Sequence, residues 1–416
     1  MKSICSLVAL ATLLVAGQAQ AASINPADVA TTYADLAHAT FDDTLLQAKS
    51  LQKEVRHLLA APSAERLEKA RAAWITARIP YSQSEVFRFG NPPVDEREGQ
   101  VNAWPLDEGM IDYVAKNYHH EMGNIAATAN IVANKELKLG TTTLPLTPIT
   151  PELLADLNEL GGSEVNVATG YHAIEFLLWG QDLNGTGPGA GERPYTDFVL
   201  GKACTHGNCD RRRDYLLAAT DLLVKDLGEM VDIWSPQSRY RKEILSTPQE
   251  ALKIMLFGMG SLALGELAGE RMKVALEANS TEDEQDCFSD NTHNAHYYNA
   301  QGVANLYKGQ YVRVDGKVVK GASLADLIKG RNPALHQRML TALADTEATL
   351  QAMVKAAEDP VKPMKFDQMI AEGNTVGATL IQNSIQALVA EAAVIEEIAK
   401  ALGINHFAPD NADHHF

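Results

Sequence analysis

The chain has 416 residues, of which 46% are hydrophobic and 21% are charged, a composition typical of a globular protein rather than a disordered one. This length exceeds that of most single-core domains, so we expect two domains. The 36 Lys and Arg residues against 53 Asp and Glu residues give a formal net charge of −17. Such acidity argues against nucleic acid and anionic lipid as main partners.

Residues 1–21 have the pattern of a secretory signal peptide. Lys2 precedes an apolar stretch from Leu7 to Gly17, and residues 19–21 (Ala-Gln-Ala) form a small-residue cleavage signal. The apolar stretch is too short to span a bilayer, and no later segment has about 18 continuous apolar residues. We therefore expect an exported protein with no transmembrane segment in the mature chain, located in the periplasm or peripheral to the outer membrane.

Three cysteines remain after cleavage: Cys204, Cys209 and Cys287. The spacing of the first two suits a small disulfide loop in an oxidising compartment. A metal site with His206 is the alternative, although it lacks a second pair of ligands. Cys287 is either free and buried or paired with one of the other two.

Helical periodicity dominates the rest of the chain. Apolar residues at three- and four-residue steps predict helices, the second of them capped by Ser63, over residues 25–60, 64–78 and beyond, 106–118, 151–160, 164–180, 211–234, 248–278, 323–330, 333–358 and 375–402. Residues 312–319, around Asp315-Gly316, are predicted to form a β-hairpin. The Gly- and Pro-rich segment 183–194 is predicted to be a long loop at a domain junction.

These elements predict an all-α fold of two helical-bundle domains, residues 22–190 and residues 191–416. A weak internal repeat is visible. The segments 84–88 and 108–113 of the first half correspond to segments 265–271 and 301–307 of the second. A genuine duplication would relate the two bundles by an internal pseudo-two-fold axis, and their interface would be the natural cleft.

The sharpest chemical signal is the segment from Gly170 to Asp182. On a helix, His172 and Glu175 lie about 60° apart on one face, so an imidazole and a carboxylate can bind one cation. Ferritin-like bundles use the same spacing in the reverse order. Gly170 removes a side chain beside the pair, which lets another element approach. The alternative is a plain His–Glu hydrogen bond inside a bundle.

A second constellation occupies residues 74–108, where an unusually polar and aromatic helix face precedes a loop. Bundle metal sites take carboxylates from several facing helices, so Glu85 and Asp107 are candidates to join His172 and Glu175. The alternative is an ion-pair network on the surface, worth little energetically. The candidate residues for contacts with a bound cofactor or ligand are Trp74, Arg78, Tyr81, Arg88, Trp104 and Trp179.

The acidic segment from Glu282 to Asn294 is dense in oxygen ligands and carries a histidine near its end. Such a loop suits a hard cation, although it does not match the spacing of an EF-hand. Asp290 and His293 are therefore further candidates for metal ligation. The alternative is an acidic loop in which Ser289 or Asp290 caps the next helix.

The pattern GxHxxExxxWGxD, from Gly170 to Asp182, resembles the signature of the imelysin family, also called peptidase M75 or the insulin-cleaving membrane protease family. The stretches 74–112, 185–198 and 282–293 resemble the iron-regulated protein A branch of that family. The resemblance implies two bundle domains of up-down topology and an envelope protein linked to iron supply. It also implies that His172 and Glu175 are the family's GxHxxE pair near the inter-domain region.

Three functions compete on this basis. We favour a metal-binding protein of iron acquisition, with His172, Glu175, Glu85 and Asp107 as ligands and iron as the expected ion, although zinc suits the same nitrogen and oxygen donors. The second is an M75-type metallopeptidase in which Glu175 activates a metal-bound water. A zinc peptidase needs about three protein ligands and one helix supplies two, so we lean against an enzyme.

The third alternative is a non-catalytic envelope protein that holds a peptide, haem or another protein in its cleft. In that case four aromatic side chains would line a binding surface instead of a core: Trp74, Tyr81, Trp104 and Trp179.

Overall fold

The computed structural model describes residues 24–120, 122, 124–404 and 407–409. The predicted signal peptide, residues 1–21, lies outside the described residues. The fold is helical, with two small two-stranded antiparallel sheets. The predicted all-α class is therefore confirmed.

The regular helices and strands have the following bounds in chain order. The helices are α1 (Pro26–Ala60), α2 (Ala64–Ser84), α3 (Pro92–Asp95), α4 (Glu98–Val101), α5 (Glu108–Ile111), α6 (Pro151–Leu157), α7 (Gly170–Trp179), α8 (Cys209–Trp234), α9 (Arg239–Ser246), α10 (Pro248–Ser261), α11 (Ala275–Ala278), α12 (Thr292–Lys308), α13 (Leu324–Arg331), α14 (Pro333–Ala357), α15 (Phe366–Ile370) and α16 (Thr375–Ala401). A π-helical segment, η6 (Leu262–Val274), joins α10 to α11, and a 3-10 turn, η1 (Glu85–Phe87), follows α2. The strands are β1 (Glu136–Leu139) with β2 (Thr142–Pro145), and β3 (Gln310–Val312) with β4 (Val318–Lys320).

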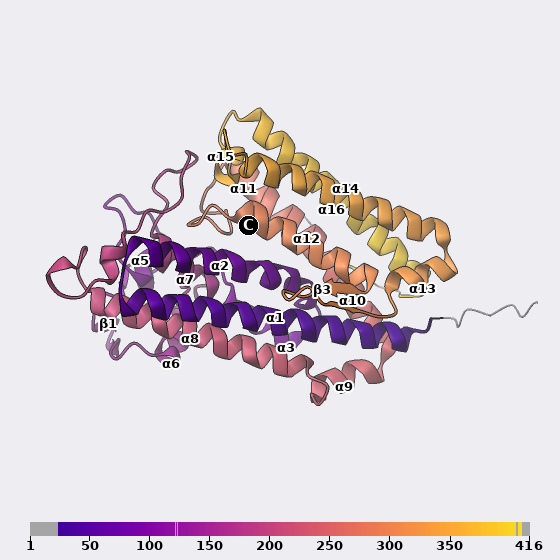
Figure 1. The fold of residues 1–416 in the computed structure, drawn as a ribbon, viewed down its shortest axis with the longest axis horizontal. Helices are drawn as coiled ribbons and strands as arrows, with labels where there is room; N and C mark the ends of the chain where they lie inside the picture. Colours follow the sequence, from indigo (N-terminus) through magenta and orange to yellow (C-terminus); the bar gives the residue numbers. More distant parts are fainter. Residues whose placement is uncertain (1–23, 121, 123, 405–406, 410–416) are drawn as a thin grey trace, which may run out of the picture.

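The long helices lie roughly along the longest axis of the molecule (Figure 1). α1 packs against α2 and α8, and α7 packs against α2 and α8. On the other side, α14 packs against α16 and α12, and α16 packs against α10 and η6. α12 also packs against α2, so it joins the two sets of helices, and one continuous hydrophobic core runs through both. The pseudo-two-fold axis and the division at residue 190 stay predictions.

Local sequence signals explain where the long helices begin. The Asn25 side chain accepts a hydrogen bond from the Asp28 backbone N–H at 3.0 Å, and Pro26 occupies the first turn of α1. The Ser63 hydroxyl accepts from the Arg66 N–H at 3.3 Å, which confirms the predicted cap of α2. These caps satisfy backbone donors that a helix leaves without a partner in its first turn.

The predicted helix over residues 106–118 is largely wrong, because only Glu108–Ile111 is helical there. Asp112 ends α5 with an extended backbone, and its carboxylate accepts hydrogen bonds from Arg193 and Arg212. Contacts with distant parts of the chain thus override the local periodicity. The predicted hairpin at 312–319 is confirmed by β3 and β4. The β1–β2 hairpin and helix α12 are not predicted from the periodicity of the sequence.

Cys204 and Cys209 form a disulfide, which confirms the small loop suggested by their spacing. Cys287 is a free, half-buried cysteine. The predicted long loop at 183–194 carries no regular helix or strand. Its Gly191 N–H donates to the Phe288 carbonyl at 2.9 Å, so this loop contacts the acidic segment that precedes α12.

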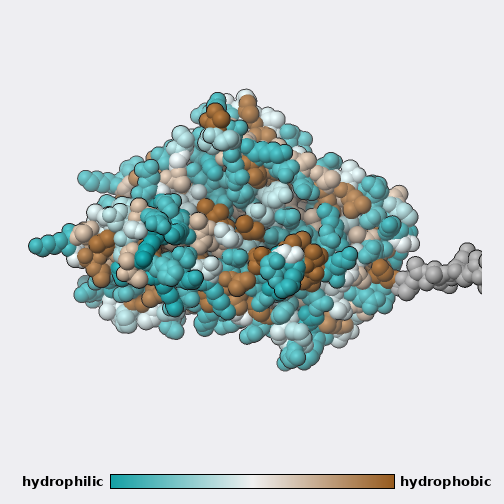
Figure 2. Space-filling model, in the orientation of Figure 1, coloured by the Kyte–Doolittle hydropathy of each residue, from teal (hydrophilic) through white to brown (hydrophobic). Residues whose placement is uncertain are grey.

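Two helices of the described chain are long and apolar enough to cross a bilayer by length and composition alone: Pro248–Ala278 and Thr375–Ala401. In the first, 72% of the apolar window is buried inside the fold, as expected of a core helix, and in the second 39% is buried. Most of the face shown in Figure 2 is hydrophilic, with small scattered hydrophobic patches. Buried core helices meet the same criteria of length and composition, so these helices are weak evidence for membrane insertion.

Candidate functional site

Helix α7 carries the candidate centre and is buried along its whole length. It begins at Gly170, whose φ of +79° lies in the left-handed region that favours glycine. A Cβ at this position would lie 2.4 Å from the carbonyl oxygen of Val101, at the end of α4. Gly170 therefore lets α4 approach the first turn of α7, as predicted from the sequence.

His172 and Glu175 meet one turn apart on α7, in the interior of the protein. The Nδ1 atom of His172 lies 2.9 Å from Oε2 of Glu175, and both side chains have no exposed surface. The second ring nitrogen of His172, Nε2, is buried and has no hydrogen-bond partner. One edge of the imidazole is thus fixed by Glu175, while the other edge is available to a ligand.

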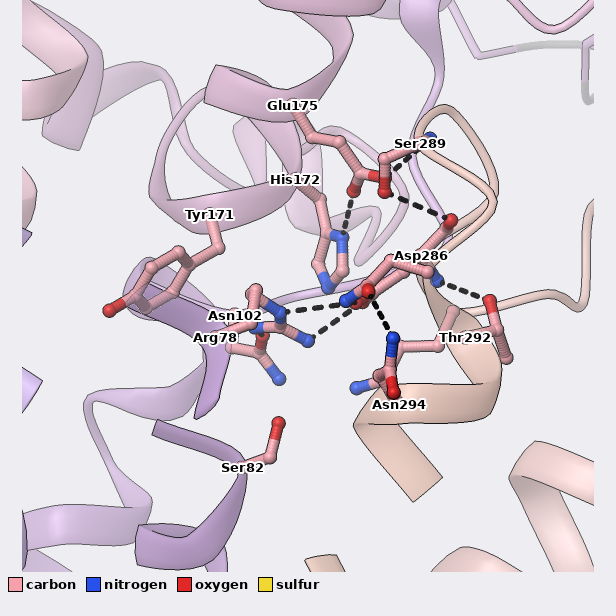
Figure 3. Close-up of polar contacts among 12 residues, drawn as sticks. Arg78, Ser82, Asn102, Tyr171, His172, Glu175, Asp286, Ser289, Thr292 and Asn294 are labelled. Carbon is pink, nitrogen blue, oxygen red and sulfur yellow. Dashed lines mark hydrogen bonds and ion pairs between the residues drawn. The ribbon is translucent and has the colours of Figure 1, made fainter. Parts of the chain in front are cut away.

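The loop before α12 closes over this pair (Figure 3). Ser289 donates two hydrogen bonds to Oε1 of Glu175, from its backbone N–H at 2.9 Å and from its hydroxyl at 2.7 Å. Asp286 from the same loop completes a cluster with His172 and Glu175, in which one ligand atom from each residue lies within 4.8 Å of the others. The cluster therefore joins α7 to the segment that leads into α12.

Arg78 on α2 holds Asp286 in place through two hydrogen bonds. Its Nη2 donates to Oδ1 at 2.8 Å and its Nε donates to Oδ2 at 3.3 Å, and both side chains are almost fully buried. The guanidinium lies 5.1–5.4 Å from the ring centroids of Trp74, Tyr81 and Tyr171. These cation–π contacts help to offset the cost of burying the charge.

The electrostatics of the centre favour a neutral imidazole. Burial, and then the positive charges of Arg78 and Arg271, hold the pKa of His172 well below its usual range. Burial, and then the charge of Asp286, raise the pKa of Glu175 well above its usual range, although the hydrogen bonds from Ser289 oppose this. The protein therefore keeps a neutral histidine, and ionisation of the neighbouring Glu175 is supported by the hydrogen bonds from Ser289 and would be favoured further by the charge of a bound ion.

The residues present fit a metal ion. When Glu175 is ionised, it accepts the Nδ1 proton of His172, and Nε2 then presents a lone pair. Asp286 has about four lone-pair positions, and Arg78 and Asn291 occupy three of them. One position on Oδ1 of Asp286 and the Nε2 lone pair of His172 are thus available as ligands. A metal held there would act as a Lewis acid or as bound cargo.

Two of the predicted site residues, Glu85 in η1 and Arg88 directly after it, belong to a different network. Both carboxylate oxygens of Glu85 accept hydrogen bonds from Arg271, at 2.7 and 3.1 Å, and Asn299 donates to the same carboxylate. Arg88 forms ion pairs with three acidic side chains, among them Glu98 at 3.3 Å. These charges already have partners within the protein.

Asp107 and Trp104 lie in the loop segment before α5. Asp107 accepts hydrogen bonds from the Tyr118 hydroxyl at 3.0 Å and from the Asn124 amide at 2.7 Å. Trp104 is half-buried, and its ring N–H has no hydrogen-bond partner. Among the described residues, two clusters of three metal-ligating groups occur, and neither contains Asp107 or Glu85.

Asp290 and His293 also lie outside the His172 cluster. Asp290 belongs to the second cluster, with Asp182 and Asp367. His293 lies 3.5 Å from a carboxylate oxygen of Glu358, and its Nδ1 is buried without a partner.

The predicted aromatic candidates on α2 and α7 are core residues. Trp74 is fully buried and its ring N–H donates to the Tyr171 carbonyl at 2.9 Å. Trp179 packs edge-on against Trp74 at 5.5 Å and contacts Arg71 through a cation–π interaction. These side chains pack around Arg78 and α7 rather than facing solvent.

Sequence reasoning missed Asp286 and Ser289, although both lie within the acidic segment that it singled out. The acidic composition of this segment indicated metal ligation. The spacing of its residues could not show which of them face α7, because a loop has no fixed periodicity. More than a hundred residues separate this loop from α7 in the chain, so only the tertiary fold brings the two together.

Comparison with known proteins identifies the family of the chain. The model of the imelysin family, peptidase M75, matches residues 37–395. The chain belongs to the imelysin family. Among characterised sequences, iron-regulated protein A of Synechococcus elongatus is 25% identical over 323 residues, which cover 75% of this chain and 71% of the relative.

Solved structures of imelysins share the fold. A candidate iron-regulated protein A precursor from Parabacteroides distasonis superposes with a TM-score of 0.63 at 17% identity, over 92% of this chain and 97% of that chain. An imelysin-like protein from Psychrobacter arcticum gives a TM-score of 0.59 at 15% identity, over 95% and 100% of the two chains. The predicted family and the helical architecture are thus confirmed.

Proposed function

We propose that this imelysin is an exported protein of iron acquisition or homeostasis that binds one metal ion, iron in the cell, at the centre formed by His172 and Asp286. The observation that carries this proposal is the buried Nε2 atom of His172, which has no partner in the protein. Burying an unsatisfied polar group is costly, so its retention indicates a role in binding. The name of the iron-regulated relative supports iron as the ion.

In this proposal Glu175 orients His172 and does not bind the metal directly, unlike the role predicted from the sequence. Its Oε2 holds the Nδ1 edge of His172, and its Oε1 accepts two hydrogen bonds from Ser289. Carboxylates that orient a ligating histidine in this way fix its tautomer and raise its basicity. Glu175 would therefore position His172, and Asp286 replaces Glu85 and Asp107 as the oxygen ligand.

A peptidase receives no support from the same geometry. A hydrolytic base must reach a water beside the substrate, but Glu175 has no exposed surface and both of its oxygens have protein partners. Asp286 is likewise buried and is held by Arg78. We therefore propose binding without hydrolysis, with an iron-carrying ligand or an envelope protein as the partner that delivers or receives the ion.

The direct test is the metal content of protein purified from the cell envelope without an affinity tag, measured by mass spectrometry. We expect about one iron or zinc ion per chain in the wild type and almost none in His172→Ala, since one protein ligand is lost. His57→Ala is the matched control, because His57 is exposed on α1 and its loss should leave the metal content unchanged. Equal metal in the wild type and His172→Ala, with unchanged helix content, would refute the site.

A further inference from the structure

A second cluster of carboxylates lies in the same region of the protein and contains no histidine. Asp182, Asp290 and Asp367 each offer an oxygen, and these atoms lie within 4.8 Å of one another. Asp182 follows α7, Asp290 lies in the loop before α12, and Asp367 lies in α15. Three separate segments thus bring negative groups to one point.

Among the described residues, no side chain donates a hydrogen bond to the carboxylate of Asp367, and only the backbone N–H groups of Asp367 and Gln368 lie near it. Its side chain is fully buried, and neither of its oxygens has a hydrogen bond of good geometry. Asp290 is also buried, and its Oδ1 has no hydrogen-bond partner. Over the described part of the chain, no ion pair joins any of the three aspartates to a basic side chain. Burying carboxylates without a positive partner is strongly unfavourable, and the described chain supplies no ion-paired basic side chain to this cluster. A bound cation would provide the missing positive charge.

The surrounding charges reinforce this conclusion. Burial, and then Asp290 and Asp182, raise the pKa of Asp367 to about 7. Burial, and then Asp182, raise the pKa of Asp290 to about 6, against the opposing influence of Lys365. A fourth carboxyl, Glu284, faces the cluster, and burial followed by Asp367 raises its pKa well above the usual range. A bound cation would relieve this mutual repulsion.

We infer that Asp182, Asp290 and Asp367 bind a hard divalent cation of the calcium type. All the donors are oxygens, which suit Ca²⁺ and disfavour softer ions that prefer nitrogen or sulfur. Calcium binds its oxygens at about 2.3–2.6 Å, so two ligands on opposite sides of the ion are about 5 Å apart. The oxygens of the cluster lie within this span, so little movement of the chain would be needed.

The cation would tie together segments that also form the His172 centre. The loop between α11 and α12 supplies Asp286 and Ser289 to that centre and Asp290 to this cluster. Asp290 has a φ of +55°, a left-handed conformation that Asp tolerates better than most residues. An ion held by Asp290 would thus fix the end of the loop that covers Glu175.

Isothermal titration with CaCl₂ tests this inference on chelator-treated protein at pH 8, with MgCl₂ titrated for comparison. We expect about one Ca²⁺ per chain in the wild type and at least about tenfold weaker binding in Asp367→Asn, because one negative ligand is lost. Asp345→Asn is the matched control, since Asp345 is exposed on α14 and should not affect the titration. Absence of calcium binding by the wild type, or equal binding by Asp367→Asn, would overturn the inference.

Thermal unfolding distinguishes the loss of a calcium ligand in Asp367→Asn from the loss of the folded structure. Without calcium, Asp367→Asn should unfold at the same temperature as the wild type or above it, because one of several repelling charges is removed. Calcium should then raise the unfolding temperature of the wild type and of His172→Ala, but not that of Asp367→Asn. Calcium stabilisation that persists in Asp367→Asn would contradict the site, whatever the outcome at the His172 centre.

Discussion

At the scale of single residues, the centre depends on which atom of His172 carries its proton. Glu175 can hold the proton on Nδ1 only by accepting it as a hydrogen bond, and this leaves Nε2 as an acceptor. The hydrogen bonds from Ser289 hold the carboxylate in the orientation that this requires. The predicted His–Glu hydrogen bond and the predicted metal site are therefore not exclusive alternatives, because the first prepares the second.

Substitution Glu175→Gln tests this role of the carboxylate. The amide can still accept from Ser289, but its NH₂ then donates to Nδ1 of His172 and drives the ring proton to Nε2. We expect metal affinity to fall by about 10–100-fold while the protein stays folded. Titration with Zn²⁺ or Fe²⁺ measures the affinity, and circular dichroism monitors the fold. Unchanged affinity would show that Glu175 does not set the tautomer.

A second residue-scale prediction concerns Glu391 on α16, which is 1% exposed and, among the described residues, has only the Thr346 hydroxyl near its carboxylate as a weak hydrogen-bond donor. Burial raises its pKa from 4.5 to about 7. The folded protein then holds this proton more tightly than the unfolded chain. Its contribution is therefore most favourable below pH 4.5 and is lost as the pH rises through about 7.

Glu391→Gln should remove this dependence. We expect the variant to be more stable than the wild type at pH 8, by up to about 3 kcal/mol, and similar to it near pH 4. Urea unfolding at the two pH values gives the difference in the free energy of unfolding. A variant that is less stable at pH 8 would mean that the ionised carboxylate has a partner in solution.

At the scale of elements, the position of α7 depends on a close backbone approach. Gly170 starts the helix with a positive φ, directly against the carbonyl of Val101. This helix and the room that Gly170 leaves for a close approach could be predicted from the sequence, because both depend on residues that are near one another in the chain. The sequence could not predict α5 to stop at Ile111, since Asp112 is held there by Arg193 and Arg212 from distant segments.

Gly170→Ala is expected to destabilise the protein by roughly 2–5 kcal/mol, from backbone strain and from the clash with α4. Gly228→Ala is the matched control, because Gly228 lies within α8 and a Cβ there meets no atom within 4 Å. The control should be stabilised by about 0.5–1 kcal/mol through helix propensity. Urea unfolding compares the two, and similar effects of both substitutions would argue against the close approach.

At the scale of the whole molecule, charged side chains buried between the helices join its two sets of helices. Arg271 of η6 reaches Glu85 after α2, and Asn299 of α12 donates to the same carboxylate. Arg78 of α2 reaches Asp286 before α12 in a similar way. Arg78 lies on the predicted helix, whereas Glu85 lies in the 3-10 turn that follows it. The partners of both side chains lie far away in the chain, so the pairing could not be predicted from spacing.

Breaking the first of these pairs should weaken the whole fold. Burial alone would raise the pKa of Glu85, but the charge and hydrogen bonds of Arg271 outweigh it and lower the pKa to about 2. Glu85→Gln should therefore cost about 3–5 kcal/mol near pH 7, because Arg271 stays buried with less compensation. In the wild type, this contribution is present above pH 4.5 and is lost as the pH falls toward about 2.

Glu397→Gln provides the control for that prediction. Glu397 pairs with Arg338 on the surface, and both side chains are about half exposed. Loss of such a pair should cost less than about 1 kcal/mol. Urea unfolding near pH 7 and near pH 3 distinguishes the two variants, and an equally small effect of Glu85→Gln would mean that the buried pair does not hold the helices together.

The most direct test of the central claim is anomalous X-ray diffraction from crystals of the protein grown with iron or zinc, recorded at the absorption edge of the metal. We predict one strong peak within bonding distance of Nε2 of His172 and Oδ1 of Asp286, and no such peak in crystals of His172→Ala. A wild-type crystal with no peak beside His172, or with its metal bound elsewhere, would contradict the proposed centre.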